Sequence, residues 1–163
     1  MSTIRGKVRK FGENVDTDTV APAPYLQLPA EEMVKYAFGP ATADFYKTVR
    51  EGDVIVAGNN FGCGSSREQA SQVVKDLGIR IIVADTIARI YYRNCIALGL
   101  FPIAAKGVSK LFEEGDEIEI DLDNLKIRNV KTDKEISFEP LAESQREIIA
   151  AGGILPLLKK MTS

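Results

Sequence analysis

The residues of this sequence that are best suited to chemistry lie in one glycine-rich segment, 58–69, which reads Gly-Asn-Asn-Phe-Gly-Cys-Gly-Ser-Ser-Arg-Glu-Gln. Its three glycines, of which Gly64 is the last, allow positive φ angles and a close approach of the backbone to a ligand. Ser65 or Ser66 is placed to cap a following helix, and an acid or amide three residues later would complete a capping box. Arg67 adds a planar cation that matches a carboxylate, beside the positive end of that helix. The segment therefore predicts a binding site for a carboxylate or a phosphate.

Two other interpretations of the segment compete with an anion site. In the first, Ser65 and Ser66 are only helix caps and Arg67 is a surface residue. In the second, the glycines bind a nucleotide. The segment lacks both the Gly-Lys-Ser/Thr of a P-loop and the G-x-G-x-x-G of a dinucleotide site, so nucleotide binding is the weaker alternative. The spacing of the glycines favours an anion site over capping alone.

The length and charge of the chain limit its fold and its partners. With 163 residues, 45% of them hydrophobic, the chain can form the core of one domain, so we expect a single domain over 1–163. Its 21 basic and 23 acidic residues are spread along the sequence and leave a net charge of -2, so no nucleic-acid partner is expected. No apolar run approaches the roughly 18 residues of a membrane span, and the N-terminus resembles a strand rather than a leader. We expect no membrane association and a cytoplasmic location.

Histidine is absent and cysteine is scarce. The lack of histidine excludes a Ser-His-Asp hydrolase within one chain and removes the commonest metal ligand. Cys63 and Cys95 match no zinc or iron–sulfur spacing and indicate a reducing compartment. Cys95 falls on the apolar side of an expected helix and should lie in the core. Cys63 is interpreted as a loop residue tolerated beside the glycines, with a redox-sensitive thiol as the alternative. No metal site is predicted in this chain.

The expected elements alternate between strand and helix, which predicts an α/β fold. Strands are expected at 4–11, 53–57, 80–84 and 101–104, and helices from Pro29 to about Gly39, at 66–77 and at 87–98. Because the last three of these strands alternate with helices, they should form a short parallel β-α-β-α-β core. The C-terminal third predicts strands at 117–122, 125–130 and 135–138, followed by helices at 144–151 and 154–160. These short strands indicate an additional antiparallel sheet packed on the core.

Several segments together carry a family resemblance. The glycine-rich segment resembles the signature of the aconitase swivel domain. Segments 14–22, 88–94 and 99–102, which read Asn-Val-Asp-Thr-Asp-Thr-Val-Ala-Pro, Ala-Arg-Ile-Tyr-Tyr-Arg-Asn and Gly-Leu-Phe-Pro, resemble further motifs of that family in the same order. From about residue 4 to the C-terminal helices, the chain is similar to the separate small subunits of 3-isopropylmalate dehydratases and homoaconitases. The resemblance implies a three-layer β/β/α swivel-like domain.

The resemblance also implies roles for the glycine-rich segment. Ser65 resembles the catalytic base, an alkoxide that removes a proton from the carbon next to a carboxylate. Arg67 resembles a clamp for a substrate carboxylate, and Gly64 and Ser66 are expected to contact the substrate with it. An ordinary serine is too weak an acid for this role, so neighbouring N–H groups, cations and a helix N-terminus must stabilise its alkoxide. The implied activity is that of a hydro-lyase acting on a small dicarboxylate.

The resemblance places the cofactor on another chain. Hydroxyl loss in this family is assisted by a four-iron four-sulfur cluster that acts as a Lewis acid and is held by three cysteines of a larger subunit. We expect this chain to bind no cofactor itself and to work with that cluster-bearing large subunit, as a heterodimer or a heterotetramer. A carboxylate-binding regulatory module and a purely structural assembly partner are the alternatives outside catalysis.

The loop 25–28 bears on the choice of substrate through the same resemblance, because it aligns with the family segment that contacts the variable substituent. Relatives that handle an extra carboxylate place an arginine there, whereas this chain has Gln27. Leu26 and Leu28 would accept an alkyl group at about 0.8 kcal/mol per buried methylene. A branched alkyl malate is therefore favoured. 3-Isopropylmalate of leucine biosynthesis is the first choice, citramalate or dimethylmalate the next, and homoaconitate the last.

For two further groups of polar residues, the sequence does not decide between a structural and a functional role. The first group, Asp16, Thr17 and Asp18, is expected to cap a turn or to organise the rim of the site. The second group lies on the helix that follows the 80–84 strand and comprises Arg89, Arg93 and Asn94. For this second group, two interpretations are about equally favoured. The residues form surface salt bridges or pack against the glycine segment, or they have a role in the site.

Overall fold

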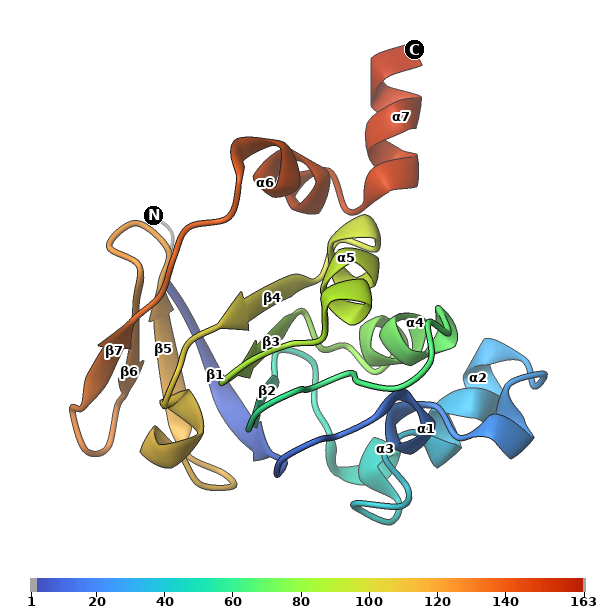
Figure 1. Ribbon diagram of the computed structural model, residues 1–163, viewed down its shortest axis with the longest axis horizontal. Coiled ribbons are helices and arrows are strands. Elements are labelled where there is room, and N and C mark those ends of the chain that lie inside the picture. The colour runs from blue at the N-terminus through green and yellow to red at the C-terminus, as the bar shows by residue number, and fades with distance from the viewer. Residues whose placement is uncertain (1–2, 163) are drawn as a thin grey trace.

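A computed structural model describes residues 3–162 of the chain, and its strands form one curled sheet (Figure 1). The strands are β1 Thr3–Lys10, β2 Val54–Ala57, β3 Ile81–Ala84, β4 Phe101–Ala104, β5 Glu117–Asp121, β6 Lys126–Asn129 and β7 Glu135–Ser137. Their order in the sheet is β4-β3-β2-β1-β5-β6-β7. Each predicted strand is therefore present, with its ends shifted by at most one residue.

The parallel half of the sheet consists of β1 to β4. β2, β3 and β4 pair in parallel, as the alternation of strands and helices predicts. All four residues of β2 and of β3 are buried, which is typical of parallel strands covered on both faces. β1 joins this half beside β2, with Val8 opposite Val54. The sequence did not predict this position of β1.

The antiparallel half begins on the other side of the same β1 strand. β5 pairs with β1, and β6 and β7 follow as antiparallel neighbours. The sheet curls, so that Val54 and Val83 of the parallel strands share one buried apolar cluster with Ile118 and Ile127 of the antiparallel strands. The expected antiparallel layer is confirmed, and β1 joins it to the core.

Two helices cover the opposite face of the parallel strands (Figure 1). They are α4, Gln69–Asp76, and α5, Arg89–Ala97. Side chains of both helices pack against Ile55 and Ile82 in a second apolar cluster. Cys95 is fully buried there, as predicted, and burial raises the pKa of its thiol. Helices, parallel strands and antiparallel strands thus form the three expected layers.

The remaining helices lie outside these layers, and the first three of them have only four residues each. They are α1 Thr17–Val20, α2 Ala30–Met33, α3 Phe45–Thr48, α6 Glu143–Ala150 and α7 Ile154–Thr162, with 3-10 turns η1 Ala23–Tyr25, η2 Val34–Tyr36 and η3 Val108–Leu111. The helix predicted from Pro29 to about Gly39 is wrong in its extent, because it splits into α2 and η2 and ends at Tyr36. Phe38 then adopts a φ of 59° and enters the core beside Phe11, so aromatic packing overrides the helical pattern. None of the helices within residues 3–162 is long and apolar enough to cross a membrane.

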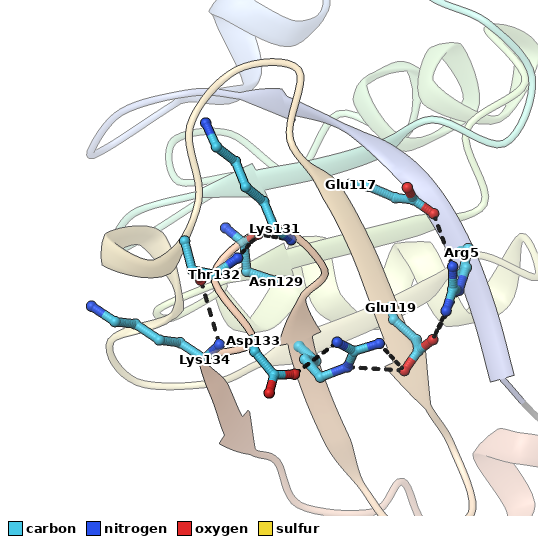
Figure 2. Close-up of polar contacts among 9 residues, drawn as sticks. Arg5, Glu117, Glu119, Asn129, Lys131, Thr132, Asp133 and Lys134 are labelled. Atoms are coloured by element: carbon cyan, nitrogen blue, oxygen red, sulfur yellow. Dashed lines mark hydrogen bonds and ion pairs between the residues drawn. The ribbon is translucent and has the colours of Figure 1, made fainter.

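Ion pairs link the strands on the outer surface of the antiparallel half (Figure 2). Glu119 on β5 lies 2.7 Å from the guanidinium of Arg5 on β1 and 3.1 Å from that of Arg128 on β6. The hydrogen bond from Arg5 holds the pKa of Glu119 below its ordinary value, and Arg128 adds to this effect. Glu119 therefore connects three neighbouring strands.

Candidate active site

The predicted site lies at the carboxyl edge of the parallel strands, where the segments that follow β1, β2 and β3 meet. The backbone N–H of Gly62 donates to Val15 at 2.7 Å, which ties the segment after β2 to the segment after β1. On its other side, the N–H of Phe61 donates to the carbonyl of Thr86, and the carbonyl of Phe61 accepts from the N–H of Ala88. Both partners lie just before α5. Ligands of open α/β sheets bind at this edge. The glycine-rich segment is thus held between two neighbouring loops.

Two of the glycines are required by this close packing. Gly62 has a φ of 82°, and a Cβ atom there would overlap the ring of Tyr91 on α5. Gly64 has a φ of 105°, and a Cβ atom there would lie 3.2 Å from the hydroxyl oxygen of Thr17. Side chains other than hydrogen are disfavoured at such angles. Gly62 and Gly64 therefore have the predicted positive φ angles and let the segment lie against both neighbours, whereas Gly58 does not have a positive φ.

Ser65 is anchored by Thr17. The backbone N–H of Ser65 donates to Thr17 Oγ1 at 3.2 Å, and the two hydroxyl oxygens are also 3.2 Å apart. Thr17 is 2% exposed and is itself fixed by a 2.8 Å bond from its N–H to the carbonyl of Cys63. Ser65 and Ser66 are exposed. A buried hydroxyl thus fixes the backbone of Ser65 while the side chain stays open to a ligand.

The predicted capping box is wrong. The helix begins at Gln69 rather than near Ser66, its N-cap residue is Glu68, and no side chain caps it. Ser65 is bonded to Thr17 instead, and the left-handed conformation of Gly64 directs the chain out of any helical path. Both serines lie in the loop before the helix. The interpretation of Ser65 and Ser66 as mere caps is therefore also wrong.

Arg67 is held by the loop that follows β1. Its Nη1 atom donates to Asp18 Oδ1 and to the carbonyl of Ala21, both at 3.1 Å. The pKa of Asp18 is lowered, chiefly by the backbone N–H of Ala23 and then by the hydrogen bond from Arg67. Asp16 instead caps α1 through a 2.8 Å bond from the Thr19 N–H. The two expected roles of this acidic pair, capping and organising the rim, are thus divided between its members.

The loop predicted to contact the substituent of the substrate follows on the same segment, directly after η1. Leu26 is half-buried and packs against the helical core. Gln27 and Leu28 are exposed. Tyr25 stacks on Tyr36 with the ring centroids 3.7 Å apart, which fixes the start of the loop. No hydrogen bond among residues 3–162 joins this loop to Ser65, and their joint contact with a substrate stays a prediction.

Arg89, Arg93 and Asn94 on α5, whose roles the sequence did not decide, have different surroundings. Arg89 and Arg93 are exposed and form no salt bridge with any residue in 3–162, so surface pairing is not their role within this chain. Asn94 lines a cavity of about 570 Å³ that runs along α4 to the turn before α7. The lining of this cavity reaches Glu68 but includes neither Ser65 nor Arg67. Ser65 is exposed and the side chain of Arg67 is 21% exposed, so this cavity is separate from the predicted catalytic groups.

The thiols of this chain do not fit an iron–sulfur cluster. Cys63 is partly exposed in the glycine-rich segment, whereas Cys95 is buried in the helical core. Within residues 3–162, no group of three or more histidine, cysteine or acidic side chains is arranged to hold a metal ion. A cluster held by three thiolates cannot be built from these two residues.

The sequence matches the aconitase C-terminal domain family over residues 12–107. This chain belongs to that family. The matched range includes the segments after β1, β2 and β3, which together form the site. The chain also resembles a crystal structure of 3-isopropylmalate dehydratase from Methanocaldococcus jannaschii, with a TM-score of 0.92 and 45% identity over 99% of this chain and 96% of the other.

Relatives within the aconitase C-terminal domain family have several different names. The isopropylmalate/citramalate isomerase small subunit of Methanocaldococcus jannaschii is 47% identical, over 98% of this chain and 95% of its own length. The 3-isopropylmalate dehydratase small subunit 1 of Thermotoga maritima is 47% identical, over 96% and 95%. The methanogen homoaconitase small subunit of Methanocaldococcus jannaschii is 46% identical, over 96% and 92%. Overall identity therefore does not separate the substrates that these names state.

Proposed function

We propose that this chain is the small subunit of a heteromeric hydro-lyase that dehydrates and isomerises a branched alkyl malate, most favourably 3-isopropylmalate. The observation that carries the proposal is the arrangement of Ser65 and Arg67. They lie two residues apart in the glycine-rich segment, and each is held by a residue of the segment after β1. The names of the similar small subunits support the same reaction class. We place the enzyme in the cytoplasm, with leucine biosynthesis as its pathway.

The proposed chemistry follows from the groups of this chain. Ser65 removes a proton from the carbon next to a carboxylate, and the proton passes to the serine oxygen. Arg67 binds that carboxylate. Its Nη1 atom is already bonded to Asp18 and Ala21, whereas no residue in 3–162 accepts a hydrogen bond from its Nε and Nη2 atoms. These two atoms form the edge of a guanidinium that pairs with a carboxylate through two hydrogen bonds.

The second half of the active site is proposed to come from the larger subunit. The two thiols of this chain cannot hold the cluster that the family resemblance implies, and Ser65 is exposed. We therefore assign departure of the hydroxyl group to the partner, and turnover requires both chains. The dicarboxylate would be bound between the two subunits.

Replacement of Ser65 by alanine tests the proposed function. The chain is mixed anaerobically with a cluster-bearing large subunit, and turnover of 3-isopropylmalate is measured. We expect Ser65→Ala to lower kcat by about a thousandfold or more, because the base is lost. Ser144→Ala, at an exposed serine on α6, is the matched control and should keep full activity. A Ser65→Ala complex with wild-type turnover would instead support a structural or regulatory subunit.

Gln27 tests the proposed substrate. Because the loop offers no cation, a third carboxylate would stay unpaired, whereas an alkyl group would contact the leucines on either side. We expect Gln27→Arg to shift the ratio of kcat/KM from isopropylmalate towards homoaconitate by about tenfold or more. Gln27→Asn, which adds no charge, should leave the ratio unchanged. An unchanged ratio in the arginine variant would remove the argument for a branched alkyl malate.

A further inference from the structure

An exposed face at the start of α5 combines two cations with an apolar side chain. Arg89 and Arg93 are four residues apart, so both point from the same side of the helix. Both are exposed, and Ile90 between them is 52% exposed. Neither guanidinium bonds to any residue within 3–162, and Glu68 at the start of the neighbouring α4 pairs with neither. We call these three residues the α5 face.

The lack of partners distinguishes these arginines from most others in the chain. Ion pairs with carboxylates hold Arg5, Arg9, Arg67 and Arg128, and backbone carbonyls accept hydrogen bonds from Arg50 and Arg80. The chain as a whole carries a net charge of -2. The α5 face is therefore a local patch of positive charge on a weakly acidic protein.

The α5 face lies beside the predicted active site. α5 follows the carboxyl end of β3, and the N–H of Ala88 donates to the carbonyl of Phe61 at 2.9 Å. The ring of Tyr91, in the first turn of α5, packs edge-on against Phe61 with the centroids 5.5 Å apart and occupies the space next to Gly62. Arg89, the residue after Ala88, therefore begins α5 directly beside the glycine-rich segment.

We propose that the α5 face docks the larger, cluster-bearing subunit, which supplies carboxylates to Arg89 and Arg93 and an apolar contact to Ile90. This inference rests on the proposed function, because that function requires a second chain to cover the site. Arginine is enriched in protein interfaces, where a few such residues supply most of the binding energy. Charge complementarity at the edge of an interface also steers association. The face is continuous with the site, so one partner surface covers both.

The test measures binding and turnover separately. Association with the purified large subunit is followed anaerobically by titration calorimetry, and turnover is measured at saturating small subunit. We expect Arg89→Glu/Arg93→Glu to weaken association by about 100-fold, and Ile90→Ser by about tenfold. The kcat at saturation should stay near the wild-type value. Arg146→Glu is the matched control, since this exposed arginine lines a cavity with Ile4 and Phe101 at the opposite edge of the parallel strands.

The possible outcomes separate the docking role from other roles. Wild-type association in the double variant overturns the proposal. A raised substrate KM with unchanged association also overturns it and assigns the arginines to the substrate. If the double variant does not fold, Arg89→Ala and Arg93→Ala are compared singly, and unchanged association in both overturns the proposal. If the wild-type complex forms without turnover of any branched malate, the proposed function fails, whereas weakened association of the variants still supports the docking face.

Discussion

At the residue scale, Thr17 supports the predicted base. Its hydroxyl is buried and lies 3.2 Å from both the backbone nitrogen and the hydroxyl oxygen of Ser65, which is 48 positions further along the chain. The sequence placed Thr17 only in a loop that caps a turn or borders the site. Thr17 would act only through Ser65, and we interpret it as a positioning residue for Ser65.

Substitutions of Thr17 test this positioning role. Thr17→Val keeps the shape of the side chain but removes the acceptor of the Ser65 N–H. Loss of a hydrogen-bond partner of this kind costs about 1–3 kcal/mol. We therefore expect kcat of the assembled enzyme to fall about 10- to 100-fold. Thr17→Ser keeps the hydroxyl and should restore most of kcat, with KM little changed in either variant. Wild-type kcat in the valine variant, with a loss in the serine variant, would show that the methyl group, and hence packing, is what matters.

At the element scale, the relation between the glycine-rich segment and α4 differs from the prediction. The helix starts at Gln69, so Ser65 and Arg67 are placed by hydrogen bonds to the segment after β1 and not by the first turn of α4. Contacts between distant segments also link the strands β1, β5 and β6. Glu119 on β5 forms ion pairs with Arg5 on β1 and with Arg128 on β6.

The pairing of Glu119 predicts a pH-dependent contribution to stability. Its pKa in the folded chain lies below the ordinary 4.5, so the folded state is stabilised above that pH. This contribution is lost as the pH falls through the lowered pKa. We therefore expect Glu119→Gln to lower Tm at pH 7 and the difference from wild type to shrink as the pH falls below 4.5. The exposed Glu135, on β7, gives the control Glu135→Gln, which should match wild type at each pH. A difference that stays constant from pH 7 to pH 3 would contradict the charge pairing.

At the scale of the whole molecule, β1 brings the two halves of the fold together. It pairs with β2 on one side and β5 on the other, so the antiparallel layer and the parallel core share one sheet. The segment that leaves β1 then supplies both Thr17 and Asp18 to the site. The carboxyl edge of the parallel strands therefore holds Ser65 and Arg67 through the segment after β1, and α5 begins beside the glycine-rich segment at the same edge.

The sequence by itself determined the type and order of most elements. The apolar runs of β2 and β3, and the apolar spacing that buries Cys95, depend on local periodicity, which a single sequence displays directly. The spacing of glycines, serines and arginine in 58–69 likewise marked the site. Only the tertiary structure decided the place of β1, the start of α4 and the contact between Thr17 and Ser65. These features depend on which distant segments pack together, and local periodicity carries no information about such partners.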